Sequence, residues 1–133
     1  MNDGDLTEAL RFWEMLEGVG LNESDTPERL AAYLRRNPGM SLVARSDGEL
    51  VGAVLCGHDG RRGYLQHLSV APEFRRKGIG KALIKRCLTR LAALDIQKCN
   101  IFVYENNEEG RQFWQRNGWR QRHDLNVMQH TIA

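Results

Sequence analysis

Apolar residues recur at three- and four-residue steps in two stretches near the start of the chain, and this spacing predicts two short helices. The first is expected over Leu6–Leu16. The second follows Ser24 or Thr26, either of which can cap its first turn. It has Pro27 at an early helical position and ends before Pro38-Gly39. The chain is therefore expected to open with two helices.

The period then changes to short runs of apolar and β-branched residues separated by glycine-containing turns. Met40–Ala44 and Leu50–Cys56 flank the turn Ser46-Asp47-Gly48, which predicts a hairpin. A second glycine-rich turn leads into Tyr64–Val70, which Ala71-Pro72 terminates. Three consecutive antiparallel strands are expected.

The second half of the chain returns to helical spacing. Six apolar residues at three- and four-residue steps predict an amphipathic helix, namely Leu83, Ile84, Cys87, Leu88, Leu91 and Leu94. A buried strand is expected over Lys98–Tyr104, a helix over Asn107–Arg116, and one or two strands within Trp119–Ile132. The order ααβββαβαβ indicates a mixed α/β fold.

Length and composition limit the organisation of the protein and its partners. A chain of 133 residues, 41% hydrophobic and 27% charged, is typical of one globular domain, expected to span residues 1–133. The net charge of +2 is too small to indicate a nucleic-acid or membrane partner. No apolar run approaches the roughly 20 residues of a spanning helix, so the protein is expected to work in solution.

The three cysteines and the histidines show no pattern of a disulfide framework or a metal site. Cys56, Cys87 and Cys99 lie far apart in apolar stretches, which favours buried free thiols and a reducing compartment. No His/Asp/Glu cluster has metal-ligand spacing, so no metal is expected. Residues 1–5 lack the basic start and apolar stretch of a signal peptide. A cytoplasmic location is therefore expected.

A basic, glycine-containing turn joins the third predicted strand to the helix after it. A strand that passes directly into a helix exposes unpaired backbone N–H groups at the helix N-terminus, where anions bind. Gly78 and Gly80 lack a Cβ, so the backbone can turn tightly and approach phosphate oxygens closely. Four basic side chains add positive charge: Arg75, Arg76, Lys77 and Lys81. The turn is a candidate pyrophosphate cradle.

The same turn also has a simpler interpretation. Two glycines can form an ordinary strand-to-helix turn with solvated basic side chains. The nucleotide-binding patterns GxxxxGK[ST] and GxGxxG after a first βα turn are absent, so this is not a nucleotide P-loop.

Two stretches of the chain carry a family resemblance. Leu68–Gly80 resembles the signature [RQ]xxGx[GA] of GNAT acetyltransferases together with the strand that precedes it. Asn107–Trp119 is similar to a second block of that family, in which an asparagine precedes an FY pair and a GF ending. The joint occurrence of both blocks in this order is far more specific than either block alone.

The resemblance implies a fold with a mixed, mostly antiparallel central sheet flanked by helices. In such proteins the strand before the turn splays from its parallel neighbour and pairs with the pantetheine arm of acetyl-CoA. That role is implied here for Leu68, Ser69 and Val70, and Lys98–Tyr104 would be the strand that splays away.

The resemblance also implies which residues bind the rest of acetyl-CoA, the expected co-substrate. The pyrophosphate would contact the turn formed by Arg75, Arg76, Lys77, Gly78, Ile79, Gly80 and Lys81, mainly through the backbone N–H groups from residue 76 onward. Asn107 would contact the coenzyme near its pantetheine. Trp114 would pack along the coenzyme arm or form part of an ordinary core.

The start of the chain departs from the family pattern. Family members usually begin with a strand, whereas Met1–Asp5 is too short and polar to form one. The first strand is therefore expected to be missing. The sheet would then begin near Met40 with an exposed edge, which favours a homodimer.

The catalytic residues also depart from the family pattern. Acetyl transfer requires an amine to lose a proton, and requires stabilisation of the thioester oxyanion and of the departing thiolate. The backbone N–H of Val70 is the candidate oxyanion donor, with Leu68 as a weaker alternative. Trp114 stands where the family often has a tyrosine acid, and its indole cannot act as an acid near neutrality. Phe102 stands where a glutamate base is often found.

Four side chains are candidate replacements for the missing acid and base. His67 suits proton transfer because an ordinary imidazole has a pKa near about 6.5. Strand alternation places it on the face opposite Val70, which is either the substrate side or a surface packed against a helix. Tyr104 and Glu105 lie where the strands should diverge, and Tyr64 is a weaker choice. A water chain could also deprotonate the amine without any side-chain base.

These expectations describe an N-acetyltransferase that moves an acetyl group from acetyl-CoA to a primary amine by direct attack in a ternary complex. The acceptor, a small-molecule or peptide amine, cannot be identified from the sequence. One alternative is a noncatalytic acyl-CoA-binding or sensing domain, motivated by Trp114 and Phe102. Another is an interaction domain whose basic turn binds nothing.

Overall fold

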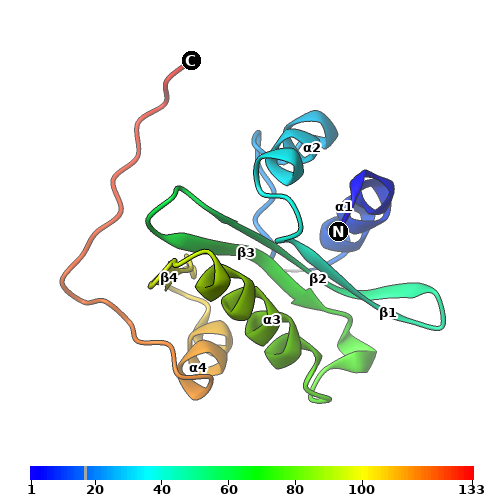
Figure 1. The fold of residues 1–133 in the computed structure, drawn as a ribbon. Helices are drawn as coiled ribbons and strands as arrows, with labels where there is room; N and C mark the ends of the chain where they lie inside the picture. The colour runs from blue at the N-terminus through cyan, green and yellow to red at the C-terminus, as the bar shows by residue number, and fades with distance from the viewer. Residues whose placement is uncertain (17) are drawn as a thin grey trace. The chain divides into compact units, whose positions relative to one another are not determined.

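The structure, a computed structural model, describes residues 1–16 and 18–133 (Figure 1). The chain forms two compact units, Met1–Phe102 and Val103–Ala133. The first unit holds the sheet and three of the α-helices, and the second holds α4 (Glu108–Arg116). Over the described residues, none of the helices combines the length and apolar character that crossing a membrane requires.

The sheet of the first unit has four strands in the order β1-β2-β3-β4. β1 (Leu42–Ser46), β2 (Glu49–His58) and β3 (Gly63–Val70) pair antiparallel, and β4 (Cys99–Asn100) pairs parallel to β3. Asp47 and Gly48 form the β1–β2 turn with φ of 50° and 80°, as a two-residue type I′ hairpin turn requires. The predicted mixed, mostly antiparallel sheet flanked by helices is confirmed.

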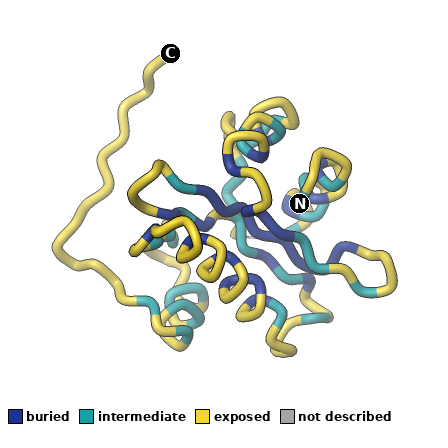
Figure 2. The backbone as a smooth tube through the Cα atoms, viewed as in Figure 1, coloured by how far each residue is buried: buried dark blue, intermediate teal, exposed yellow. Residues whose placement is uncertain are grey.

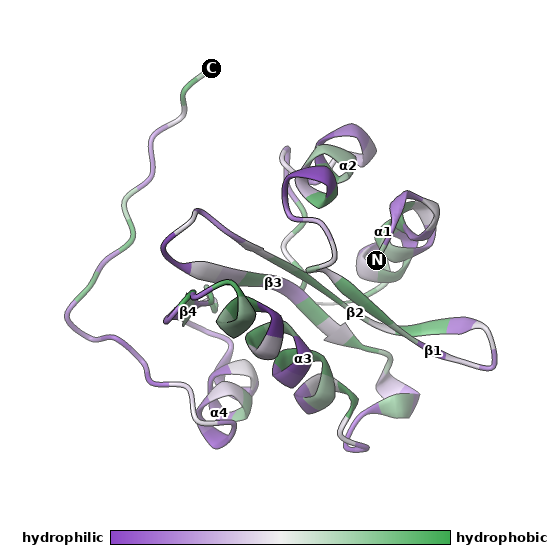
Figure 3. Cartoon of the chain, viewed as in Figure 1, coloured by the Kyte–Doolittle hydropathy of each residue, from purple (hydrophilic) through white to green (hydrophobic). Residues whose placement is uncertain are grey.

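Helices cover both faces of this sheet (Figure 1). α1 (Leu6–Glu14) and α2 (Pro27–Arg36) share a buried cluster with Ala53 and Leu55 of β2. α3 (Ile79–Ala93) lies on the other face, where a Cβ added to Gly52 of β2 would come within 3.3 Å of the Ile79 side chain. β2 is buried over most of its length, as the dark blue tube of Figure 2 shows, and Figure 3 shows hydrophobic segments along it.

The helix boundaries follow the signals in the sequence. The hydroxyl of Thr26 accepts a hydrogen bond from the N–H of Arg29 at 3.2 Å, so Thr26 rather than Ser24 caps α2. A 3-10 turn at Asp3–Asp5 precedes α1, and no strand precedes α1 in the described part of the chain. A second 3-10 turn, Pro72–Phe74, follows β3.

Two strand predictions near the end of the chain are wrong. The strand expected over Lys98–Tyr104 consists only of Cys99–Asn100, and Phe102 is 65% exposed. Residues 119–133 form neither helix nor strand, although strands were expected within Trp119–Ile132. An apolar or alternating run becomes a strand only where a neighbouring strand pairs with its backbone, and the run itself does not specify that partner.

Candidate active site

A β-bulge at His67 interrupts β3. Ala53 of β2 pairs with Ser69, whereas Leu55, two residues further along β2, pairs with Gln66. One β2 residue therefore faces two β3 residues, and His67 adopts a left-handed conformation with φ of 55°. The simple alternation of faces expected along this strand does not hold, because the bulge inserts one extra residue.

The bulge sets the direction of the Val70 backbone N–H. The N–H of Ala71 donates to the carbonyl of Val51 at 2.8 Å, so Ala71 and Val51 form a hydrogen-bonded pair. Such pairs alternate with non-hydrogen-bonded pairs in an antiparallel ladder, so the pair of Val70 with Gly52 is of the second kind. The N–H of Val70 therefore points away from β2, whereas the Ser69 backbone faces it.

The edge of β3 toward β4 is open at Val70. Pairing between β3 and β4 covers only Gly63 with Cys99 and Tyr64 with Asn100. The next residues of β3 have no strand neighbour on that side within the described residues. The Val70 N–H therefore points toward the edge of β3 that β4 leaves unpaired at this position.

The His67 side chain lies against the α1 layer of the molecule. Its Nε2 is 3.0 Å from Oδ1 of Asp25, and the two side chains are only 13% and 8% exposed. The ring lies beside the Trp13 indole, with 5.3 Å between ring centroids. Trp13 Nε1 and the Ser69 hydroxyl both donate to the His67 carbonyl at 3.0 Å. The bulge is therefore held by side chains as well as by the sheet.

Asp25 was not among the residues that the sequence suggested. It lies in the segment between α1 and α2, 42 residues before His67. Its Oδ2 accepts the N–H of Asn22 at 3.0 Å, and the Asp25 N–H donates to the Asn22 carbonyl at 3.0 Å. No periodicity or spacing connects it with His67, because the contact depends on the bulge and on the path of this segment.

The basic turn presents backbone donors at the start of α3. Arg76 and Gly78 have φ of 64° and 84°, and Gly78 is the N-cap residue without a side-chain cap. The first N–H groups of α3 are therefore left for another acceptor. Gly80 is buried in the first turn, and a Cβ added to Gly78 would meet nothing within 4 Å. Gly78 is thus required for its conformation rather than for lack of space.

The basic side chains of the turn have partners of their own. Arg75 Nε donates to the Val70 carbonyl at 3.0 Å, which joins the turn to the end of β3. The Lys77 ammonium lies 5.2 Å from the centre of the Phe74 ring. Both are exposed, so they contribute charge at the surface while the backbone supplies the directed donors.

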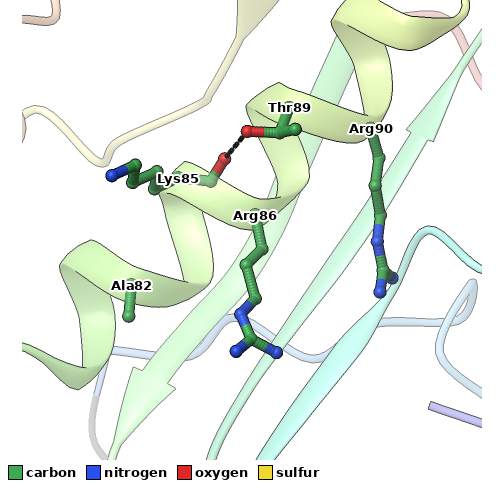
Figure 4. A pocket seen from close by; sticks show the side chains of 5 residues that line it. All are labelled: Ala82, Lys85, Arg86, Thr89 and Arg90. Atoms are coloured by element: carbon green, nitrogen blue, oxygen red, sulfur yellow. Dashed lines mark hydrogen bonds between the residues drawn. The ribbon is translucent and has the colours of Figure 1, made fainter.

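A basic surface hollow continues along α3 (Figure 4). It is lined by Ala82, Lys85, Arg86, Thr89 and Arg90. Arg90 donates a hydrogen bond to the Gly39 carbonyl, and the Thr89 hydroxyl donates to the Lys85 carbonyl at 2.9 Å. The hollow extends the positive charge of the turn but contains neither His67 nor Val70.

Four of the predicted site residues belong to the second unit. Asn107 caps α4, with its side-chain oxygen accepting the N–H of Gly110 at 2.9 Å. Trp114 packs edge-on against Trp119 with 4.9 Å between centroids. Tyr104 is 64% exposed, and Glu105 lies in a turn. Across the described residues, no group of three or more His, Cys, Asp or Glu side chains could hold a metal ion.

The sequence is similar to those of known acetyltransferases. The sequence profile of the Acetyltransferase (GNAT) family matches residues 7–119. An acetyltransferase of Photorhabdus laumondii is 34% identical over 125 residues, covering 93% of this chain and 86% of that protein.

Two solved structures are similar in fold. The PaiA N-acetyltransferase from Thermoplasma acidophilum in complex with coenzyme A has a TM-score of 0.77 at 21% identity, covering 90% of this chain and 86% of that one. The aminoglycoside 6′-N-acetyltransferase from Acinetobacter haemolyticus has a TM-score of 0.80 at 15% identity, covering 100% and 97%. The extent of the profile match and the identity to the Photorhabdus protein show that the chain belongs to the GNAT acetyltransferase family.

Proposed function

We propose that this protein transfers the acetyl group of acetyl-CoA to a primary amine by direct attack in a ternary complex. The observation that carries the proposal is the Val70 N–H, which the bulge directs into the open edge of β3. Arg75 joins this edge to the turn that begins α3. A donor for a thioester oxygen and a set of donors for phosphates therefore lie in one segment of the first unit.

The residues present fit the two ends of the coenzyme. The uncapped N–H groups of Ile79, Gly80 and Lys81 match the acceptor oxygens of a pyrophosphate. The open edge beside Leu68 and Val70 can pair with the amide groups of an extended pantetheine arm. Acetyl-CoA supplies the activated acetyl group, and the protein holds it in a position for attack.

The proposed proton acceptor is His67. It lies three residues before Val70, so the two positions are within about 10 Å along an extended strand. A neutral imidazole can take the proton that the attacking amine loses. Tyr104 and Glu105 remain alternative candidates, and Asn107 and Trp114 are proposed coenzyme contacts from the second unit.

The proposed acceptor is a small molecule with a primary amine, in a cytoplasmic setting. The aminoglycoside acetyltransferase from Acinetobacter haemolyticus shares the fold over almost its whole length, which supports this class of acceptor. The family profile spans parts of both compact units, which supports the expectation of one acetyltransferase domain over residues 1–133.

The proposal is tested by thiol release from acetyl-CoA in the presence of kanamycin, spermidine or an alanine-initiated peptide. We expect release that depends on one of these amines, together with saturable binding of CoA by calorimetry. Binding without release for a broad amine library would favour the acyl-CoA sensing alternative. Absence of binding would refute both.

A further inference from the structure

We propose that Asp25 is a positioning residue that fixes the imidazole of His67 with its proton on Nε2 and leaves Nδ1 to accept the proton of the amine. This inference rests on the proposed acetyl transfer and adds a residue to it. The two side chains form a buried pair between the bulge of β3 and the segment that joins α1 to α2.

The chemistry of the contact decides the tautomer. An ionised carboxylate can only accept hydrogen bonds, so the Nε2 atom 3.0 Å from Asp25 Oδ1 must carry the proton. In a neutral imidazole the other nitrogen is then an acceptor. His67 Nδ1 is therefore the basic atom of the ring.

No hydrogen bond to Nδ1 of His67 occurs among the described residues, and the His67 side chain is 13% exposed. Nδ1 is then left to accept the proton of the amine.

Contacts from three directions hold this geometry. Trp13 of α1 supports the ring and donates to the His67 carbonyl, and Ser69 donates to the same carbonyl. Asp25 is itself fixed by two hydrogen bonds to the backbone of Asn22. The Asp25 carboxylate lies against Nε2 of the imidazole, and the Trp13 indole beside the ring is neutral. A base held in this way loses little freedom when the substrates bind.

The step is balanced without a further reagent. The amine nitrogen forms a bond to the acetyl carbon, and the carbon–sulfur bond breaks with its electron pair remaining on sulfur. The proton lost by the nitrogen moves to Nδ1 of His67, and the resulting imidazolium is stabilised by the Asp25 carboxylate. That proton then passes to the thiolate, which regenerates the neutral imidazole.

A purely structural contact would join the α1–α2 segment to the sheet without affecting proton transfer. The two roles are separated first by the tautomer of His67, measured by ¹⁵N NMR on the protein without substrates at a pH where the ring is neutral. We expect the Nε2–H form. The Nδ1–H form in the wild-type protein would overturn the proposal, and this measurement requires neither a variant nor catalytic activity.

Kinetics provide the second test, with Asp25→Asn, His67→Ala and the matched control Glu23→Gln, which removes an exposed charge from the same segment. We expect kcat to fall about 100-fold in His67→Ala and about tenfold in Asp25→Asn, the usual range for a proton acceptor and its support. Glu23→Gln should behave as wild type. The binding of CoA should stay within about twofold in all three variants, because the coenzyme contacts are elsewhere.

The split between kcat and KM for the amine identifies the role of the carboxylate. Asp25→Asn should lower kcat and kcat/KM for the amine together, because the imidazolium that the carboxylate stabilises forms only in the transition state. An unchanged kcat and KM in Asp25→Asn would overturn the proposal. So would a higher KM for the amine with unchanged kcat, since that result would make Asp25 a binding residue for the acceptor. If the wild type transfers no acetyl group, the proposed function fails and this role of the pair fails with it, whatever tautomer is found.

Discussion

At the scale of single residues, Gly78 is the position in the basic turn where the backbone conformation matters most. Its φ of 84° costs an alanine about 1–2 kcal/mol, so a substitution will shift the first N–H groups of α3. We expect Gly78→Ala to weaken CoA binding about tenfold, and Lys77→Ala to weaken it less because the Lys77 side chain is exposed. Calorimetry with CoA measures both.

Gly48 provides a matched control for this prediction. It also has a positive φ, 80°, and open space around an added Cβ, but it lies in the β1–β2 turn. Gly48→Ala should lower stability by a similar amount and leave CoA binding unchanged. A larger loss for Lys77→Ala than for Gly78→Ala would show that side-chain charge, and not the backbone, binds the pyrophosphate.

The next prediction concerns the reactivity of the Cys99 thiol. It also bears on the activity assay, because that assay measures the release of a thiol. Burial, with a smaller contribution from Cys87, raises the pKa of the Cys99 thiol to about 12. At pH 8 its thiolate fraction is then about 10³-fold below that of a free cysteine, and alkylation should be slower by a similar factor. Mass spectrometry after iodoacetamide treatment measures the rate, with the unfolded chain as the control. Labelling of the native protein at the rate of the unfolded chain would contradict this.

At the scale of elements, the bulge in β3 depends on a contact from α1. Trp13 is fully buried, and its indole N–H is one of two donors to the His67 carbonyl. Trp13→Phe removes this donor and leaves a small cavity, so the free energy of unfolding should fall by about 2 kcal/mol. Urea denaturation measures the change. Met15→Ala is the control, because the Met15 side chain is 84% exposed, and it should change the free energy of unfolding by less than about 0.5 kcal/mol. Equal effects of Trp13→Phe and Met15→Ala would refute the role of Trp13.

The elements differ in how well the sequence predicts them. The helices and the β1–β2 hairpin follow from local spacing, caps and turn residues, because those signals act between near neighbours. The bulge at His67 and its contact with Asp25 join residues 42 positions apart, and no local pattern encodes them. The sequence predicts the basic turn because its glycines and basic residues are adjacent in the chain. It does not predict the role of Asp25, because acidic residues near the start of a helix are common.

At the scale of the whole molecule, two surfaces are candidates for the expected homodimer. β1 lies at the edge of the sheet, but it has a register shift between Ala44 and Arg45, and Arg45 forms ion pairs with Asp5 and Glu8. Bulges and charged side chains weaken an edge strand as a pairing surface. The second candidate is the chain after Trp119, where four large apolar side chains are exposed: Leu125, Val127, Met128 and Ile132.

We expect the dimer to form through these apolar side chains, since burial of each stabilises an interface by about 1.5–3 kcal/mol. Multi-angle light scattering at micromolar concentration should show a dimer for the full chain and a monomer for a chain ending at Trp119. The shorter chain keeps every proposed coenzyme contact, so its affinity for CoA should match that of the full chain. A dimer in both chains would assign the interface to another surface, such as the edge of β1. If both chains are monomers, the prediction of a homodimer is wrong, and the exposed apolar side chains would then require a different partner.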